Sequence, residues 1–286
     1  MSLVLRGRGD PVTVDPEGPV RVIGERINPS GRKAMLEALR SGGWEEILRA
    51  EAIAQAEAGA QVIDVNVGGK GVDEAEILPE AVRIVAAAVD LPLSIDTRNP
   101  AALEKALALC PGRPLVNSIG GEDRVLAENL PIAADYGVPV VALCMGQEGI
   151  PKNADERLSV AHRVLDAAVK AGIREEDVIF DPLIMTVGAD DQAARTALET
   201  IRRLRAEFPV NCVTGGASNV SFGMPCRAAL NARFLSVAIV LGLNLPITDP
   251  TIPDLRWAIA SGTLFLGRDR KNREYMRLYR ELGQEG

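Results

Sequence analysis

The chain has 286 residues, of which 47% are hydrophobic and 25% are charged, and its formal net charge is −7. This composition is typical of a globular protein with a large core, and the length suits one barrel or two domains of average size. Nucleic acids and anionic membranes need a basic face, which an acidic chain of this kind does not suggest, so we expect neither as a partner.

Targeting and redox signals indicate a cytoplasmic protein. Residues 1–8 include no apolar stretch of signal-peptide length, and no run approaches the roughly 18 apolar residues of a membrane span. The four cysteines are far apart and form no CxxC pair, which argues against a zinc ribbon or an iron–sulfur cluster. Cys144 and Cys212 stand in apolar runs, so we expect both to be buried as reduced thiols.

The chain begins with a polar segment rich in Pro and Gly, residues 1–19, which we expect to be a loose lead-in to a folded body at 20–286. From Val20 onward, strand-like and helix-like segments alternate. Strands are predicted near 20–24, 61–66, 92–96, 113–117, 138–143, 177–181, 209–213 and 244–248. Helices are predicted near 44–58, 73–89, 100–109, 122–135, 155–171, 190–207, 226–241 and 252–261, with a C-terminal helical extension at 270–283.

This alternation predicts an α/β fold, a (β/α)8 TIM barrel. The strands are short and apolar without a two-residue alternation, which is typical of parallel strands covered on both faces. Asn99 before Pro100 is a helix start, and Gly59, Gly137 and Gly172 each end a helical run just before a strand. Eight strand–helix units favour the barrel over a doubly wound sheet, which normally needs fewer.

Polar residues stand where the predicted strands end. In a barrel these ends converge on one mouth, where the active site lies. The candidates are Glu25, Asn28, Asp64, Asp96, Asn117, Asp181, Ser218 and Asn219, with Arg227 shortly after the seventh strand. For each of them a local turn or helix-cap role is the alternative.

The residue types favour some chemistries over others. A carboxylate held at Asp181 can accept two parallel hydrogen bonds from an amidine-like N–H pair, as pterins and guanine-like rings present. The Gly/Ser loop at 215–223 is also compatible with an anion-binding nest. A metal site of acidic side chains is an alternative, but the interleaved Asn residues argue against it and we predict none. His162, the single histidine, lies on a polar helix face, so we expect it at the surface and no Ser–His–Asp triad.

In combination, these segments resemble the pterin-binding barrel family. The family includes dihydropteroate synthases, the folate domain of cobalamin-dependent methionine synthase, and methyltetrahydrofolate:corrinoid protein methyltransferases. The resemblance covers roughly 20–250, with Gly-Glu-Arg-Ile-Asn, Ile-Asp-Val-Asn-Val-Gly, Ile-Asp-Thr, Val-Asn-Ser, Asp-Pro-Leu-Ile and Ser-Asn-Val-Ser in the family's order. Within the family it favours the methyltransferases, because the synthases' Gly-Phe-Gly-Lys and Ser-Arg-Lys segments are replaced by Leu183-Ile184-Met185 and Ser218-Asn219-Val220.

The resemblance implies roles for individual residues. Asp96, Asn117 and Asp181 would hold the pterin ring, and Asn219 would bind near N5, so that Asn219 and Asp96 are the catalytic candidates. Glu25, Asn28, Asp64, Ser218 and Arg227 are supporting candidates for the substrate site. Some relatives carry Gln where this chain has Phe222, so that contact is not carried over.

The implied activity is transfer of the N5-methyl group of methyltetrahydrofolate to cob(I)alamin on a separate corrinoid protein, or the reverse. The corrinoid would sit on a partner, because His162 lies in no Asp-x-His-x-x-Gly motif. Relatives are commonly homodimers, and we expect the same here. The alternatives are a folate-binding subunit of a split methionine synthase, a dihydropteroate synthase, and a phosphate-sugar barrel enzyme that uses the 215–223 loop.

Overall fold

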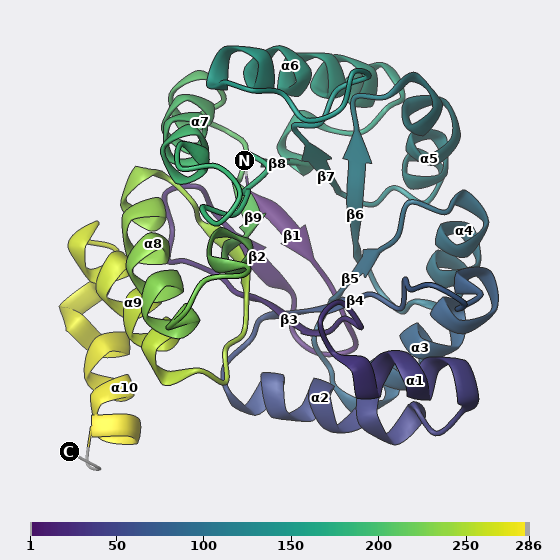
Figure 1. The fold of residues 1–286 in the computed structure, drawn as a ribbon, viewed down its shortest axis with the longest axis horizontal. Helices are drawn as coiled ribbons and strands as arrows, with labels where there is room; N and C mark the ends of the chain where they lie inside the picture. Colours follow the sequence, from purple (N-terminus) through teal and green to yellow (C-terminus); the bar gives the residue numbers. More distant parts are fainter. Residues whose placement is uncertain (1, 284–286) are drawn as a thin grey trace.

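Eight parallel strands form a barrel in the computed structural model, which describes residues 2–283 (Figure 1). Their order in the sheet is β8-β7-β6-β5-β4-β3-β10-β9, and a parallel bridge between Phe180 and Val213 joins the two outer strands. The strands are β3 (Ile23–Ile27), β4 (Val62–Val65), β5 (Leu93–Asp96), β6 (Leu115–Gly120), β7 (Val140–Leu143), β8 (Val178–Asp181), β9 (Thr214–Gly216) and β10 (Leu245–Thr248). The predicted barrel is confirmed.

Helices surround the barrel on the outside (Figure 1). They are α1 (Lys33–Ser41), α2 (Glu45–Glu57), α3 (Glu74–Ala88), α4 (Pro100–Leu109), α5 (Asp123–Asp135), α6 (Ala154–Lys170), α7 (Ala193–Glu207), α8 (Arg227–Leu241), α9 (Pro253–Phe265) and α10 (Arg273–Leu282). Short 3-10 turns are η1 (Glu175–Asp177), η2 (Ala217–Ser221) and η3 (Arg270–Asn272). Asn99 caps α4 as predicted, with its side chain accepting from the backbone N–H groups of Ala101 and Ala102.

Within the barrel and its surrounding helices, the seventh strand and α1 differ from the sequence prediction. The seventh barrel strand, predicted at 209–213, lies at 214–216, because Asn211 closes a turn onto the carbonyl of Phe208 and only Val213 bridges to the neighbouring strand. Helix α1 was not predicted. Its N-cap residue, Arg32, makes no side-chain capping bond, so the usual start signal is missing from the sequence.

The N-terminal segment closes one end of the barrel. β1 (Leu3–Leu5) pairs antiparallel with β2 (Val12–Val14), so the expectation of a loose segment is wrong for this stretch. Leu3, Leu5 and Val14 are buried against residues near the amino ends of the barrel strands, including Val62 and Leu115. Alternate apolar residues in both short strands drive this burial. The barrel is therefore left open at the carboxyl ends, while the boundary at residue 19 stays a prediction.

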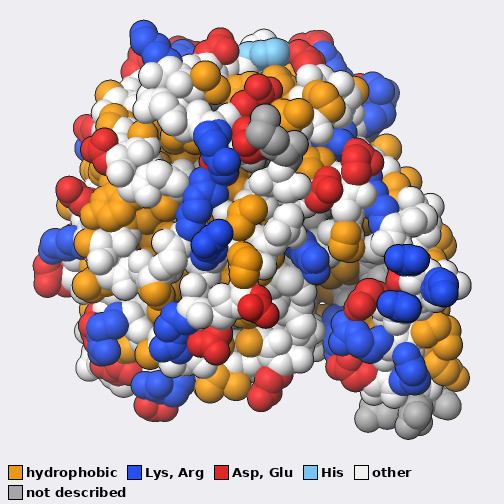
Figure 2. Space-filling model, turned by 180° about the vertical axis from the view of Figure 1, so that it is seen from behind, with side chains coloured by type: hydrophobic (Ala, Val, Ile, Leu, Met, Phe, Trp, Pro, Cys, Tyr) orange, Lys and Arg blue, Asp and Glu red, His pale blue; other side chains and the backbone are white. Residues whose placement is uncertain are grey.

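The main core lies between the barrel and the helices, and it includes the buried thiol of Cys144. Cys212 is also buried, as predicted. Helix α10 packs on α9, where the rings of Trp257 and Tyr275 meet at 5.3 Å. Figure 2 shows a hollow between this last helix and the body, where a cavity of about 130 Å³ lies. No helix between residues 2 and 283 has the length and apolar character needed to cross a membrane.

Candidate active site

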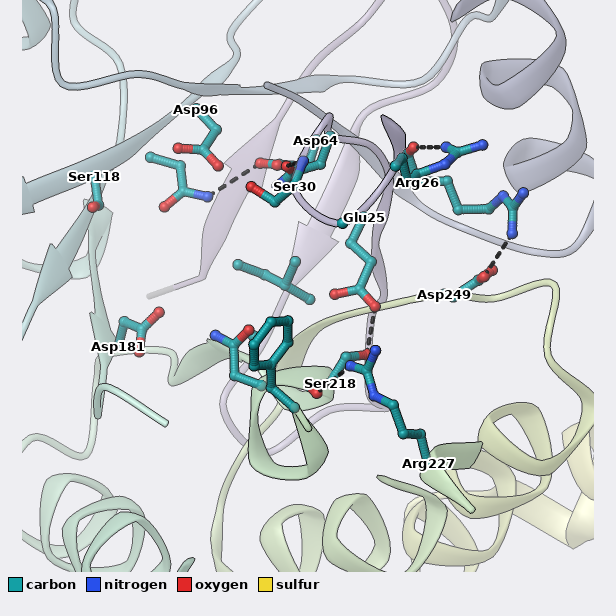
Figure 3. A pocket seen from close by; sticks show the side chains of 18 residues that line it. Glu25, Arg26, Ser30, Asp64, Asp96, Ser118, Asp181, Ser218, Arg227 and Asp249 are labelled. Atoms are coloured by element: carbon teal, nitrogen blue, oxygen red, sulfur yellow. Dashed lines mark hydrogen bonds and ion pairs between the residues drawn. The ribbon is translucent and has the colours of Figure 1, made fainter. Parts of the chain in front are cut away.

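A cavity of about 560 Å³ opens at the carboxyl ends of the barrel strands. All nine residues proposed from the sequence line it: Glu25, Asn28, Asp64, Asp96, Asn117, Asp181, Ser218, Asn219 and Arg227. In Figure 3, Asp96, Ser118 and Asp181 stand on one side, and Glu25, Ser218 and Arg227 on the other. The individual roles of these residues stay predictions, but their convergence on one cavity is a property of the fold.

Two acids stand on the adjacent strands β4 and β5, Asp64 buried and Asp96 half-buried. Asp64 accepts from the Ser94 hydroxyl at 2.7 Å and from the Asn117 amide at 3.1 Å, and Asp96 accepts from the Asn66 amide at 2.8 Å. Burial raises both pKa values: that of Asp96 to about 6, and that of Asp64 well above its ordinary range, helped by the Asp96 charge. Both acids therefore hold their protons to a higher pH than an exposed aspartate does.

Asp181 ends β8 and is also buried. Its Oδ1 accepts from the backbone N–H of Leu183 at 2.8 Å, and the Arg157 guanidinium holds the same turn by donating to the Pro182 and Leu183 carbonyls. Burial raises the pKa of Asp181 to about 6, opposed by the Leu183 hydrogen bond and the Arg157 charge. Among residues 2–283, no group donates to Oδ2, so this oxygen is available to a ligand in the cavity.

The backbone beside Asp181 at Gly215 is crowded for any side chain. A Cβ at Gly215 would stand 2.9 Å from the Ile184 side chain and 3.5 Å from Asp181 Oδ1. The backbone φ of Gly215 is +156°. The Gly-Gly pair after Thr214 thus lets β9 approach the acid closely. This explains why the strand prediction, which stopped at 213, missed the segment.

The opposite side of the cavity is built on η2. The Ser218 hydroxyl donates to Glu25, while Arg227 donates to the Ser218 carbonyl at 3.0 Å and to the Ser221 hydroxyl at 3.0 Å (Figure 3). These bonds fix the turn that carries Asn219. Burial raises the pKa of Glu25 to about 7, and the nearby Asp249 charge adds to the effect, whereas Ser218 and Arg227 oppose it.

Asn219 presents its side-chain amide at this turn. Its Nδ2 lies over Gly216, where a Cβ would approach it to 2.8 Å, and the amide makes no hydrogen bond to any residue within 2–283. Phe222 follows on the same segment, 64% exposed, with the Arg227 guanidinium 5.8 Å from its ring centre. A free amide and an exposed aromatic ring thus flank one side of the cavity.

Sequence reasoning missed a charged network at the rim. Arg26 donates to Asp249 at 2.8 Å and to Glu51 at 3.1 Å, and Arg32 donates to Glu51 and to the Arg26 carbonyl. Arg26, Arg32 and Asp249 all line the cavity. Asp249 directly follows β10, so the strand-end rule applied to the eighth strand would have found it. Glu51, on α2, gives no such signal.

The lining can recognise a polar heteroaromatic ring. It combines carboxylate and amide acceptors on one side with an acid and a free amide on the other, and no lysine lines the cavity among the described residues. Within 2–283 no cluster of three His, Cys, Asp or Glu side chains is placed to hold a metal ion. His162 is half-exposed on α6 beside Glu207, so the prediction of a surface histidine is confirmed.

Comparisons with known proteins agree with this picture. Residues 24–249 match the model of the family described as pterin binding enzymes. The chain is 32% identical over 265 residues to the methylcorrinoid:tetrahydrofolate methyltransferase of Eubacterium limosum, covering 91% of this chain and 96% of that one. It is 30% identical over 243 residues to the methionine synthase of Mycobacterium tuberculosis, covering 81% of this chain and only 20% of that protein.

Solved structures share the barrel. Yersinia pestis dihydropteroate synthase with a pterine–sulfa conjugate has a TM-score of 0.68 at 22% identity and covers 93% of this chain and 99% of that one. The synthase from Xanthomonas albilineans with 7,8-dihydropteroate also has a TM-score of 0.68 at 22% identity, covering 92% and 98%. At this identity the likeness establishes the fold alone.

Proposed function

The chain belongs to the pterin-binding enzyme family, and from that premise we propose that it is a methyltransferase acting between tetrahydrofolate and a corrinoid protein. It moves a methyl group between N5 of the folate and the cobalt of a corrinoid carried by the partner. The observation that carries the proposal is the cavity at the strand ends, where the ring-binding candidates Asp96, Asn117 and Asp181 face the free amide of Asn219 without a lysine in the lining.

The cavity suits a pterin ring. Its volume of about 560 Å³ falls within the usual range for small-molecule sites, roughly 300–1,000 Å³. Asp181 Oδ2 is available to accept from the amino group and the adjacent ring N–H of the pyrimidine edge. Asn117 and Asp96 supply mixed donors and acceptors for the remaining polar edge. Buried acceptors of this kind favour a ligand with N–H donors, because a buried acceptor without a hydrogen bond costs free energy.

The methyl transfer itself needs help at N5. An N-methyl amine is a poor methyl donor because its leaving group would be a deprotonated amine. The barrier therefore falls when N5 is protonated or strongly hydrogen-bonded. Asn219 suits the N5 environment, since an amide both donates and accepts. The corrinoid supplies the cobalt that accepts or gives the methyl group. The chain's own residues bind the folate, orient it and manage the proton.

We propose that the corrinoid protein docks at the barrel mouth, because the other end is closed by the β1–β2 hairpin. His162 lies on the outer helix α6 and is hydrogen-bonded to Glu207, away from the cavity lining, so it does not offer a cobalt ligand there. We place this chemistry in the cytoplasm, where thiols such as those of Cys144 and Cys212 stay reduced.

We also propose that a second copy of the chain covers the outer face of α8 and α9. Val237 and Val240 on α8 are each about half-exposed, and Phe265 on the neighbouring α9 is 72% exposed. A helix that is apolar on its outer side needs a partner surface. Val237→Glu should convert the dimer to a monomer in light scattering after gel filtration. A wild-type protein that is already monomeric would contradict the proposal.

A second candidate is a folate-binding subunit of a split methionine synthase. It is favoured by the match to methionine synthase, of which this chain spans about a fifth. The two candidates share the methyl-transfer step and differ in the partner. Co-purification with a corrinoid protein, followed by an assay for methionine formation from homocysteine, distinguishes them.

The direct test mixes the purified chain with methyltetrahydrofolate and cob(I)alamin and follows methylcobalamin by its absorbance. The reverse reaction starts from methylcobalamin and tetrahydrofolate. We expect transfer in at least one direction, and p-aminobenzoate with a pterin pyrophosphate should give no dihydropteroate. Absence of transfer in both directions, with free cobalamin and with a corrinoid protein, would refute the proposed function.

A further inference from the structure

Glu25 is a half-buried carboxyl group in the cavity lining, on the side of Ser218 and Arg227 and across from Asp96 and Asp181 (Figure 3). Its carboxylate accepts from the Ser218 hydroxyl, and Ser218 immediately precedes Asn219 in η2. One short turn therefore carries both the free amide and the hydroxyl that contacts this acid. The Ser218 hydroxyl thus connects a protonatable group to the turn whose amide is proposed to bind N5.

The charges around Glu25 balance its two protonation states. Burial and the Asp249 charge, after β10, favour the neutral acid, while the Ser218 hydroxyl and the Arg227 charge from α8 favour the carboxylate. The Glu25 charge in turn raises the pKa of Asp64 on β4. Arg26, the next residue along β3, is bound to Glu51 and Asp249. As a result the pKa of Glu25 is raised to about 7, where an acid exchanges protons in both directions at neutral pH.

We propose that Glu25 is the group that exchanges the N5 proton during methyl transfer, through one bridging water beside Asn219. This inference rests on the proposed function and names the proton donor within it. In transfer to cobalt, the N5–methyl bond breaks, its electron pair stays on N5, and the proton leaves Glu25 and ends on N5. The cobalt of cob(I)alamin supplies the electron pair of the new cobalt–methyl bond. In the reverse direction N5 attacks the methyl group and returns its proton to the Glu25 carboxylate.

The other groups of the cavity are less suited to this step. Asp181 is tied to the Leu183 N–H and faces the ring edge, Asp96 accepts from Asn66, and Asp64 accepts from Ser94 and Asn117. Asn219 cannot release a proton near neutral pH. After Glu25 loses its proton, the Ser218 hydroxyl and the Arg227 charge stabilise the carboxylate that remains.

The test is the pH dependence of Glu25→Gln, which keeps the shape of the neutral acid but has no proton to give. Single-turnover transfer to cob(I)alamin should fall by roughly 10²-fold or more, a usual contribution of a general acid. The affinity for methyltetrahydrofolate should change less than about threefold. The wild-type rate should fall as pH rises through about 7 for transfer to cobalt, and rise through the same region for the reverse reaction. Both inflections should disappear in the variant.

A second readout does not depend on turnover. Infrared spectra of the wild-type enzyme should show a protonated carboxyl C=O band that titrates near pH 7, and Glu25→Gln should lack it. Ser218→Ala removes a bond that stabilises the carboxylate, so the midpoint of band and rate should move to higher pH. Glu176→Gln, at a buried glutamate in η1 and outside the cavity lining, is the matched control and should change neither.

The outcomes distinguish failure of the Glu25 assignment from failure of the proposed function. If the wild-type enzyme transfers no methyl group in either direction, the proposed function fails and this inference with it. If the wild type transfers methyl and Glu25→Gln keeps the same rate and pH profile, only the assignment of Glu25 is wrong. Should Glu25→Gln fail to fold, Ser218→Ala decides, since an unmoved midpoint would also overturn the assignment.

Discussion

Replacing Asp181 by Asn should weaken folate binding without harming the fold. In the wild type, Oδ1 accepts from the Leu183 N–H at 2.8 Å and leaves Oδ2 available to the cavity. The Asn side chain keeps the first bond through its oxygen and turns an NH2 group toward the ligand. The pyrimidine edge then meets a donor where it needs an acceptor, and two hydrogen bonds to a charged oxygen are lost.

Hydrogen bonds to charged groups contribute about 1.5–3 kcal/mol each to stability. Two of them are lost together and water partly replaces them, so we expect a loss of about 2–4 kcal/mol. At 1.4 kcal/mol per tenfold, this corresponds to roughly 30- to 700-fold weaker binding of methyltetrahydrofolate. Isothermal titration calorimetry measures it directly, with Asp191→Asn, on an exposed loop, as the matched control.

The same change predicts the effect on stability and its sign. The pKa of Asp181 is raised from its ordinary 3.8 to about 6, so its contribution to stability is present below pH 4 and lost as pH rises through 6. At pH 7 the ionised group therefore opposes folding, and Asp181→Asn should melt at the same temperature or a few degrees higher. Affinity within about threefold of wild type would refute the contact. A lowered melting temperature would refute the electrostatic reasoning.

Two further changes probe other parts of the site. Asn219→Ala should lower the methyl-transfer rate about 10²-fold and folate affinity far less; equal losses in both, measured by single turnover and calorimetry, would remove Asn219 from the transition state. Arg26→Met leaves Glu51 and Asp249 without one shared cation, and should cost about 2–4 kcal/mol of unfolding free energy in urea titrations. An unchanged urea midpoint would show that water screens these partly exposed charges.

The fold was predictable because its signals are local. Parallel strands covered on both faces read as short apolar runs, and residues such as Asn99 and Gly172 mark where helices start and end. The hairpin at 3–14 was missed because its strands have three residues each, too few for a periodic pattern. Its burial depends on the barrel end it covers, which no local pattern encodes.

Which residues line the site could be predicted from the sequence, but how they interact could not. The strand-end rule found Asp96 and Asp181, which end β5 and β8. It also found Asn117, which lies inside β6 but pairs with Asp96 across the sheet. It could not show that burial raises the pKa values of both Asp64 and Asp96, or that the Ser218 hydroxyl connects Glu25 to the turn of Asn219. Those properties arise from side chains that meet across the barrel. Spacing along the chain does not specify them.

Burial of the acidic groups in the cavity costs stability, and a bound ligand would offset that cost. Glu25, Asp96 and Asp181 have pKa values raised to about 7, 6 and 6, and in each case burial is the first cause. Such groups destabilise the empty barrel at neutral pH, because a raised pKa marks a charge that the protein solvates worse than water does. A ring that brings N–H donors to Asp181 and Asp96 relieves that cost, so folate affinity should fall as pH drops below about 6 and these acids protonate. Glu25 has a different role. Its pKa near 7 does not favour holding a ring, but it suits a group that gives up a proton and takes it back. The acids of recognition and the acid of proton exchange would therefore separate on a pH profile, the first in affinity and the second in rate.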